Sequence, residues 1–335
     1  MSATTPADAS APLPADTSAP LPVPSYPRIA GRILLFWALT LLFLVFLAAP
    51  IRLARRALRA AGNPVTALHD VAIDHPILIP IALAEVLAVL LATHIMRRRS
   101  RLAWADVGLA RGRAARDLLL GVVIGVIEFA LVPLLAAAGG WIEIGPGAAL
   151  EGGAGLAGAL LSLAIVLLAM LPAAAFEEIT DRGYAVTLLA ARSKVAAVLV
   201  TALVFTVMHA GNAGFDAVAF AHVFVAGVAL AVGRIRSGAL WLPIGWHFGW
   251  NAAQGWLFGA AVSGMRPAAF PLSTLRLRGP ELLTGGTFGP ESGLIAVAAS
   301  LVTLVAYWKL VPARAAQPAP PNEPSSHPMS SPIAS

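Results

Sequence analysis

Long apolar runs, separated by short polar segments, make up most of this chain. A transmembrane helix needs about 20 apolar residues, because the hydrocarbon core of a bilayer is about 30 Å thick. Eight runs approach or reach that length, near residues 31–50, 76–95, 117–138, 156–176, 195–210, 217–233, 238–260 and 291–308. The pattern predicts an all-α fold, a polytopic membrane helical bundle with about eight transmembrane helices.

The two ends of the chain differ from the rest. Residues 1–27 are rich in Pro and Ala, and residues 313–335 are rich in Pro and Ser. Such segments cannot bury enough apolar surface to fold. We therefore expect two disordered tails around one transmembrane domain at residues 28–312.

The composition supports a membrane environment. Hydrophobic residues make up 58% of the chain and charged residues 12%, whereas a soluble domain has about 25% charged residues. The net charge of +6 comes from basic clusters at the ends of apolar runs, where they indicate topology. We therefore expect the lipid bilayer, and no nucleic acid, as a partner. The absence of cysteine excludes disulfides and Cys-based metal sites.

The basic residues between the runs predict the orientation. Lys and Arg are retained on the cytoplasmic side of membrane proteins. With the N-terminus inside, 16 of the 23 Lys and Arg residues fall in inner segments and 7 in outer ones. Both termini are therefore expected to be cytoplasmic. The basic cluster at residues 52–59 falls in an outer segment and does not fit this orientation, so we expect it on an amphipathic interfacial helix. The Arg-rich and Ala-rich composition is typical of a bacterial protein, so the expected location is the bacterial inner membrane.

Ionisable side chains inside apolar runs are costly, so they are the first candidates for function. Glu177 and Glu178 end the fourth run, with Arg182 four residues after Glu178. On a helix Glu178 and Arg182 share a face and can pair, whereas Glu177 points about 100° away. Taken alone, this segment could also be an ion pair that closes a helix.

A histidine ends the fifth run. Glu177 lies 16 residues before Ser193, and His209 lies 16 residues after it. If the chain turns near Ser193, both side chains sit about 24 Å from the turn, on two antiparallel helices. We therefore expect Glu177 and His209 to face each other.

The seventh run contributes His247 and Asn251, which are at i and i+4 and so project from one helical face. A hydrogen bond between helices is the structural alternative for such a pair. Glu85, Glu128 and His222 also lie within apolar runs, and we expect them to be structural or to line a cavity.

Together these residues resemble the CPBP family of intramembrane peptidases, which contains the type II CaaX prenyl endopeptidases and bacteriocin-immunity-like proteins. The matching motifs are EExxxR (Glu177, Glu178, Arg182), FxxxH (Phe205, His209) and HxxxN (His247, Asn251). The resemblance covers a peptidase core at about residues 160–260. Asp181 departs from the family pattern, in which an aromatic residue usually precedes the Arg.

The resemblance implies an endopeptidase that cleaves peptide or membrane-protein substrates with an activated water. In this interpretation Glu177 is the general base, His209 holds the water, and His247 and Asn251 face the oxyanion. Glu178 and Arg182 would support them. Zinc stays open as a cofactor, held by Glu177, His209 and His247, because two His and one Glu can bind it.

Two other classes of function remain open. Buried Glu, His and Arg also build the proton relays of ion-coupled transporters. A non-catalytic membrane scaffold could bind a partner protein through the same residues. Cleavage that depends on Glu177 would distinguish the peptidase from both.

Overall fold

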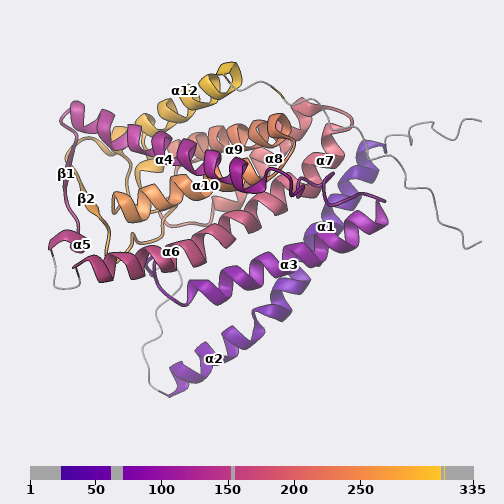
Figure 1. Ribbon diagram of the computed structural model, residues 1–335, viewed down its shortest axis with the longest axis horizontal. Coiled ribbons are helices and arrows are strands. Elements are labelled where there is room, and N and C mark those ends of the chain that lie inside the picture. Colours follow the sequence, from indigo (N-terminus) through magenta and orange to yellow (C-terminus); the bar gives the residue numbers. More distant parts are fainter. Residues whose placement is uncertain (1–23, 62–70, 152–154, 311–312, 314–335) are drawn as a thin grey trace, which may run out of the picture.

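The computed structural model describes residues 24–61, 71–151, 155–310 and 313. The tails predicted at 1–27 and 313–335 lie almost wholly outside these residues, and the first helix begins at Tyr26. The long helices lie roughly side by side, with α2 at one edge of the molecule and α12 at the other (Figure 1).

Helices account for most of the described chain. The longer ones are α1 (Tyr26–Leu47), α2 (Ala49–Ala60), α3 (Leu78–Arg99), α4 (Ala114–Ala138), α6 (Gly155–Glu178), α7 (Tyr184–Ala190), α8 (Lys194–His209), α9 (Ala217–Ser237), α10 (Trp241–Ala252) and α12 (Leu294–Leu310). Two short helices, α5 (Ala148–Glu151) and α11 (Glu281–Thr284), lie in the connections. The basic cluster at 52–59 falls on α2, as expected.

Each of the eight predicted runs coincides with a helix, and the protein is a multi-pass membrane protein. Among the described residues, five helical units are long and apolar enough to cross a membrane: α1, α3, α4, the continuous unit Gly155–Ala190, and α9. The count of eight spans is not confirmed, because α8, α10 and α12 are shorter than a typical span.

Two helices of the bundle contain a π-helical turn. The first π-turn (Ile179–Gly183) joins α6 to α7, and the second π-turn (Ala253–Leu257) follows α10. Such turns hold an extra residue and occur often at functional sites. Here each one directly follows residues that the sequence singles out.

Glycines set the distance between α4 and α10. A Cβ atom at any of four glycines would lie within 2.4 Å of a backbone oxygen of the other helix: Gly121 and Gly125 on α4, and Gly245 and Gly249 on α10. Small residues four apart let two membrane helices approach until their backbones touch. We call this contact the glycine seam.

Polar side chains cap the helices near the candidate site. Ser193 Oγ accepts a hydrogen bond from the Ala196 amide at the start of α8, at 3.1 Å, and Asp216 does the same for α9 through the Ala219 amide, at 2.7 Å. Such caps satisfy free amides at a helix N-terminus. The turn expected near Ser193 is therefore present.

A two-stranded antiparallel sheet was not expected from the sequence. Strand β1 (Ile142–Pro146) pairs with β2 (Ser273–Leu277), with Ile142 opposite Leu277. The exposed pair Glu143 and Arg278 bridges it at 2.9 Å. The sheet ties the segment after α4 to the segment before α12.

Candidate active site

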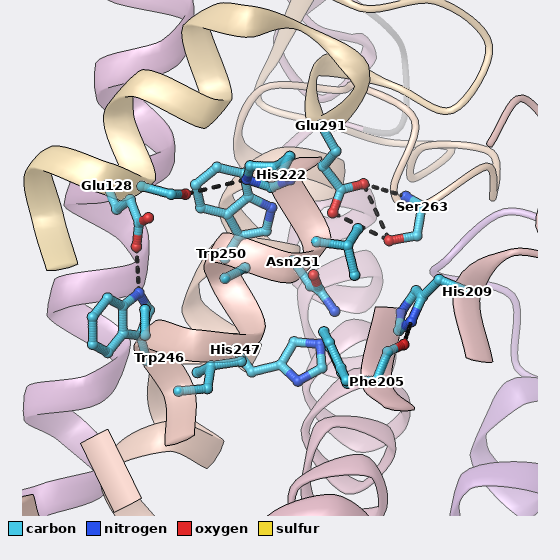
Figure 2. Close-up of a pocket in the computed structure, with 15 residues that line it drawn as sticks. Glu128, Phe205, His209, His222, Trp246, His247, Trp250, Asn251, Ser263 and Glu291 are labelled. Atoms are coloured by element: carbon cyan, nitrogen blue, oxygen red, sulfur yellow. Dashed lines mark hydrogen bonds between the residues drawn. The ribbon is translucent and has the colours of Figure 1, made fainter. Parts of the chain in front are cut away.

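Three distant segments meet at the candidate site. Glu177 and Glu178 end α6, His209 ends α8, and His247 and Asn251 lie on α10. Figure 2 shows His209, His247 and Asn251 around one cavity. The Phe205 ring contacts both histidines, with centroids 4.6 Å from His209 and 5.8 Å from His247.

Glu178 connects two partners. Its Oε1 accepts a hydrogen bond from Arg182 Nη1 at 2.7 Å, so the predicted pair is confirmed. The same oxygen lies 3.0 Å from His247 Nδ1, a contact that the sequence did not indicate. Glu178 and Arg182 are fully buried. Because a buried carboxylate is costly without partners, this shared oxygen holds Arg182 and His247 in place.

The partners of the two histidines determine their protonated nitrogens. His209 Nδ1 lies 2.7 Å from the Phe205 carbonyl oxygen, which can only accept, so Nδ1 carries the proton. The Glu178 carboxylate likewise requires a proton on His247 Nδ1. The Nε2 atoms are thus left for chemistry, 3.8 Å (His209) and 3.9 Å (His247) from Glu177 Oε2.

Glu177 lies at the edge of the buried region. Its side chain is 30% exposed, but Oε2 is buried and has no hydrogen-bond partner among the described residues. Distances of 3.8 and 3.9 Å are too long for direct hydrogen bonds and are of the size that a bridging water spans. The expectation that Glu177 and His209 face each other is confirmed.

The donor types of this group suit zinc, but their spacing does not form a ligand set. Imidazole nitrogens and carboxylate oxygens are usual zinc ligands. Within the described ranges, no three His, Asp or Glu side chains form a group that could hold a metal ion. We therefore derive the chemistry from the side chains alone.

Asp181 adds a third carboxylate near Glu177 and Glu178. It lies in the first π-turn, is 1% exposed, and neither of its oxygens has a hydrogen-bond partner within the described residues. Its charge interacts with those of Arg182, Glu178 and Glu177. It therefore affects the charge balance of the site without a direct bond.

A cavity with about 50 Å³ of water-accessible space adjoins these groups. It is lined by His209, His247 and Asn251, whereas Glu177 and Glu178 are not among its lining residues. Glu128 and His222 also line it, so the expectation for these two is confirmed. Glu85 is not a lining residue, but its charge interacts with that of Glu177.

The sequence did not single out Glu291, which reaches the cavity from the segment before α12. Its Oε2 accepts hydrogen bonds from the Ser263 amide at 2.5 Å and from Gln254 Nε2 at 3.0 Å. Burial raises the pKa of the Glu291 carboxyl, and the hydrogen bonds partly offset that rise. Glu291 stands at the first position of the eighth apolar run and belongs to no motif, so the sequence did not distinguish it from a residue that begins a helix.

Residues 159–253 match the family model described as "Rce1-like: Type II CAAX prenyl endopeptidase Rce1-like". This segment is similar to that family. It contains Glu177, Glu178, His209, His247 and Asn251, whereas Glu128 and Glu291 lie outside it. The family resemblance expected from the motifs is therefore confirmed. No curated protein matches the chain.

Proposed function

We propose that this protein is an intramembrane endopeptidase that cleaves peptide or membrane-protein substrates by attack of an activated water. The observation that carries the proposal is the convergence of two imidazole Nε2 atoms on one carboxylate oxygen, Glu177 Oε2, at 3.8 and 3.9 Å. The similarity of residues 159–253 to the type II CAAX prenyl endopeptidase family supports the same interpretation.

Glu177 and His209 would activate the water. A water hydrogen-bonded to Glu177 Oε2 and His209 Nε2 transfers a proton to the carboxylate as its oxygen attacks the peptide carbonyl carbon. Glu177, now protonated, returns that proton to the leaving amine nitrogen when the C–N bond breaks. Both protons of the water are then in the products, one on the amine and one on the new carboxyl group.

His247 and Asn251 would stabilise the oxyanion. Both line the cavity beside His209. The Glu178 carboxylate at Nδ1 favours an imidazolium form of His247, whose Nε2–H can donate to the negative oxygen. The Asn251 amide supplies further N–H donors. Arg182 acts only through Glu178.

Replacement of Glu177 tests the proposal. We expect Glu177→Gln to lower kcat/KM for a fluorogenic peptide panel by about 10²–10⁴-fold, since it removes the general base but keeps the side-chain shape. His209→Ala and His247→Ala should show comparable losses. The measurement uses purified full-length protein in detergent, with size-exclusion profiles to verify folding.

Glu143→Gln, an exposed change on β1, serves as the matched control and should leave cleavage unchanged. Normal activity of Glu177→Gln would contradict the assignment. A transporter or a scaffold would show no cleavage that depends on Glu177.

Zinc is a cofactor that the donor types at Glu177, His209 and His247 would suit. Zinc supplies Lewis-acid polarisation and a nucleophilic hydroxide where it is bound. Metal analysis of the same preparations decides its role: one zinc per chain, with chelator-sensitive cleavage, would support it. Full activity of zinc-free protein would exclude it.

A further inference from the structure

The cavity extends beyond the motif residues to a second group of polar side chains. We call Glu128, His222, Trp246 and Ser300 the inner polar cluster; they come from α4, α9, α10 and α12 and all line the cavity. Figure 2 shows Glu128 and Trp246 on the side of the cavity opposite His209. The mechanism proposed above uses none of these side chains.

Hydrogen bonds join the inner polar cluster in two pairs. Trp246 Nε1–H donates to a carboxyl oxygen, Glu128 Oε2. His222 Nε2 lies 3.2 Å from Ser300 Oγ. When the proton of the neutral imidazole is on Nε2, His222 donates to Ser300 and its Nδ1 is an acceptor.

This acceptor has no donor. His222 is 2% exposed, and its Nδ1 has no hydrogen-bond partner in the part of the chain that the structure describes. A buried polar atom without a partner needs an explanation, and a ligand that supplies the missing hydrogen bond is one. The inner end of the cavity thus presents two acceptors, the Glu128 carboxylate and His222 Nδ1.

The charges of the cavity favour a cation. Glu128 and Glu291 both line it, none of its fifteen described lining residues is Lys or Arg, and the imidazolium form of His247 would offset only one of the two carboxylates. Arg182, which packs on the Phe205 ring at 4.3 Å, is already paired with Glu178. A guanidinium or ammonium group would supply both the missing charge and several N–H donors.

The walls of the cavity suit an aliphatic stem. Apolar and aromatic side chains line the cavity together with the motif residues and Glu128, among them Val223, Ala226, Leu230, Trp246 and Trp250. Lys and Arg bury their methylene stems along such surfaces, and aromatic faces attract their charged heads. The charge of the cavity, its hydrogen-bond acceptors and its apolar walls all favour a ligand with a cationic head and an aliphatic stem.

We propose that the cavity is a specificity pocket for a basic side chain, Lys or Arg, of the substrate residue next to the scissile peptide bond. The charged head binds Glu128 and His222, and the stem packs on Trp246 and Trp250. The assignment of the pocket to the residue next to the scissile bond rests on the proposed function, because His209, His247 and Asn251 line the same cavity.

Binding of two small probes tests the pocket without cleavage. Butylguanidinium carries the charged head, and butylurea is its neutral isostere. We expect butylguanidinium to bind the full-length protein at least about tenfold more tightly, because a desolvated charge pair discriminates strongly. Tryptophan fluorescence is the readout, since Trp246 and Trp250 line the pocket.

Glu128→Gln should reduce the affinity ratio of the two probes to about one, whereas Glu143→Gln should leave it unchanged. Equal affinity of both probes for the parent protein would overturn the proposal, and that comparison needs no variant to fold. A preference for butylguanidinium that survives in folded Glu128→Gln would also overturn it.

Cleavage provides the second arm. Peptides that differ only in Lys, Arg, Met or Gln beside the scissile bond are compared by kcat/KM. We expect the basic peptides to be preferred by about tenfold or more, and Glu128→Gln to remove the preference while cleavage of the Met peptide persists. If the parent cleaves no peptide but still discriminates between the probes, the peptidase function fails and the cation pocket stands. If it cleaves all four peptides equally, the pocket proposal fails and the peptidase function stands.

Discussion

At the scale of single residues, charge is unevenly distributed around Arg182. Glu177, Glu178 and Asp181 lie within five residues of one another, and only Glu178 bonds to Arg182. Like charges close together in a buried site disfavour one another. Asp181 is buried and has no hydrogen-bond partner among the described residues. Of the three carboxyl groups, it is therefore the least stabilised by its surroundings.

We expect Asp181→Asn to raise the stability of the protein by about 1–3 kcal/mol, because it removes a buried carboxyl group that is repelled by Glu177 and Glu178, at nearly constant volume. Thermal unfolding in detergent measures this as a higher Tm. The contrasting variant is Glu178→Gln, which should destabilise by about 3–5 kcal/mol, since it breaks a buried ion pair. A lower Tm for Asp181→Asn would mean that this carboxylate stabilises Arg182 instead.

At the scale of elements, the glycine seam positions the site. It holds α10 against α4, so that Trp246 reaches Glu128 while the next residue, His247, reaches Glu178 on α6. Neighbouring residues on a helix point about 100° apart, so one helix can serve both partners. A change in the distance between α4 and α10 would therefore disturb both the inner polar cluster and the active site.

Gly125→Ala should separate the two helices, because its Cβ would lie 2.1 Å from the Trp246 carbonyl oxygen. We expect a loss of about 1–3 kcal/mol from overpacking. A shift of His247 by about 1 Å would lower kcat/KM by up to about 10²-fold. Unfolding and cleavage assays measure both effects.

Gly31→Ala is the matched control, because a Cβ there meets nothing within 4 Å. In the second turn of α1, it should stabilise by up to about 1 kcal/mol through helix propensity alone. Equal effects of the two variants would show that the glycine seam is not tight.

At the scale of the whole molecule, periodic features were predictable and contacts between distant segments were not. The apolar runs indicated every long membrane helix, and the i, i+4 spacings indicated that Glu178 and Arg182 pair. Equal distances from Ser193 indicated that Glu177 and His209 meet. The link from Glu178 to His247 could not be predicted, because it depends on how α10 packs against α6.

The cavity, too, could be predicted only in part from the sequence. Glu128 and His222 were conspicuous as polar residues in apolar runs, but Ser300 and Glu291 resemble any other serine or glutamate in the sequence. They become partners only after α12 and the segment before it pack onto α4 and α9. The sheet of β1 and β2 escaped prediction for a similar reason, since its two strands are far apart in the chain.

The orientation in the membrane gives a prediction for the whole chain. Arg28 and Arg32 of α1 line one crevice with Arg99 of α3, so the start of α1 and the end of α3 lie on the same side. Because basic residues stay inside, we expect green fluorescent protein to fluoresce when fused to either terminus. Alkaline phosphatase, which is active only outside the cytoplasm, should be inactive there and active when inserted after Gly140. Phosphatase activity at either terminus would contradict this orientation.

The two π-turns have a consequence for changes in chain length. Each holds one residue more than an α-helical turn would, directly after Glu178 in one helix and soon after Asn251 in the other. A π-turn takes up its extra residue within one turn, so the helix beyond it keeps its direction relative to the helix before it. Loss of one residue between Glu178 and Arg182 would restore regular winding and shorten the spacing of this pair from four residues to three. A deletion there would therefore change the contacts made inside the turn, above all the pairing of Glu178 with Arg182, and would leave the packing of α7 on α8 in place.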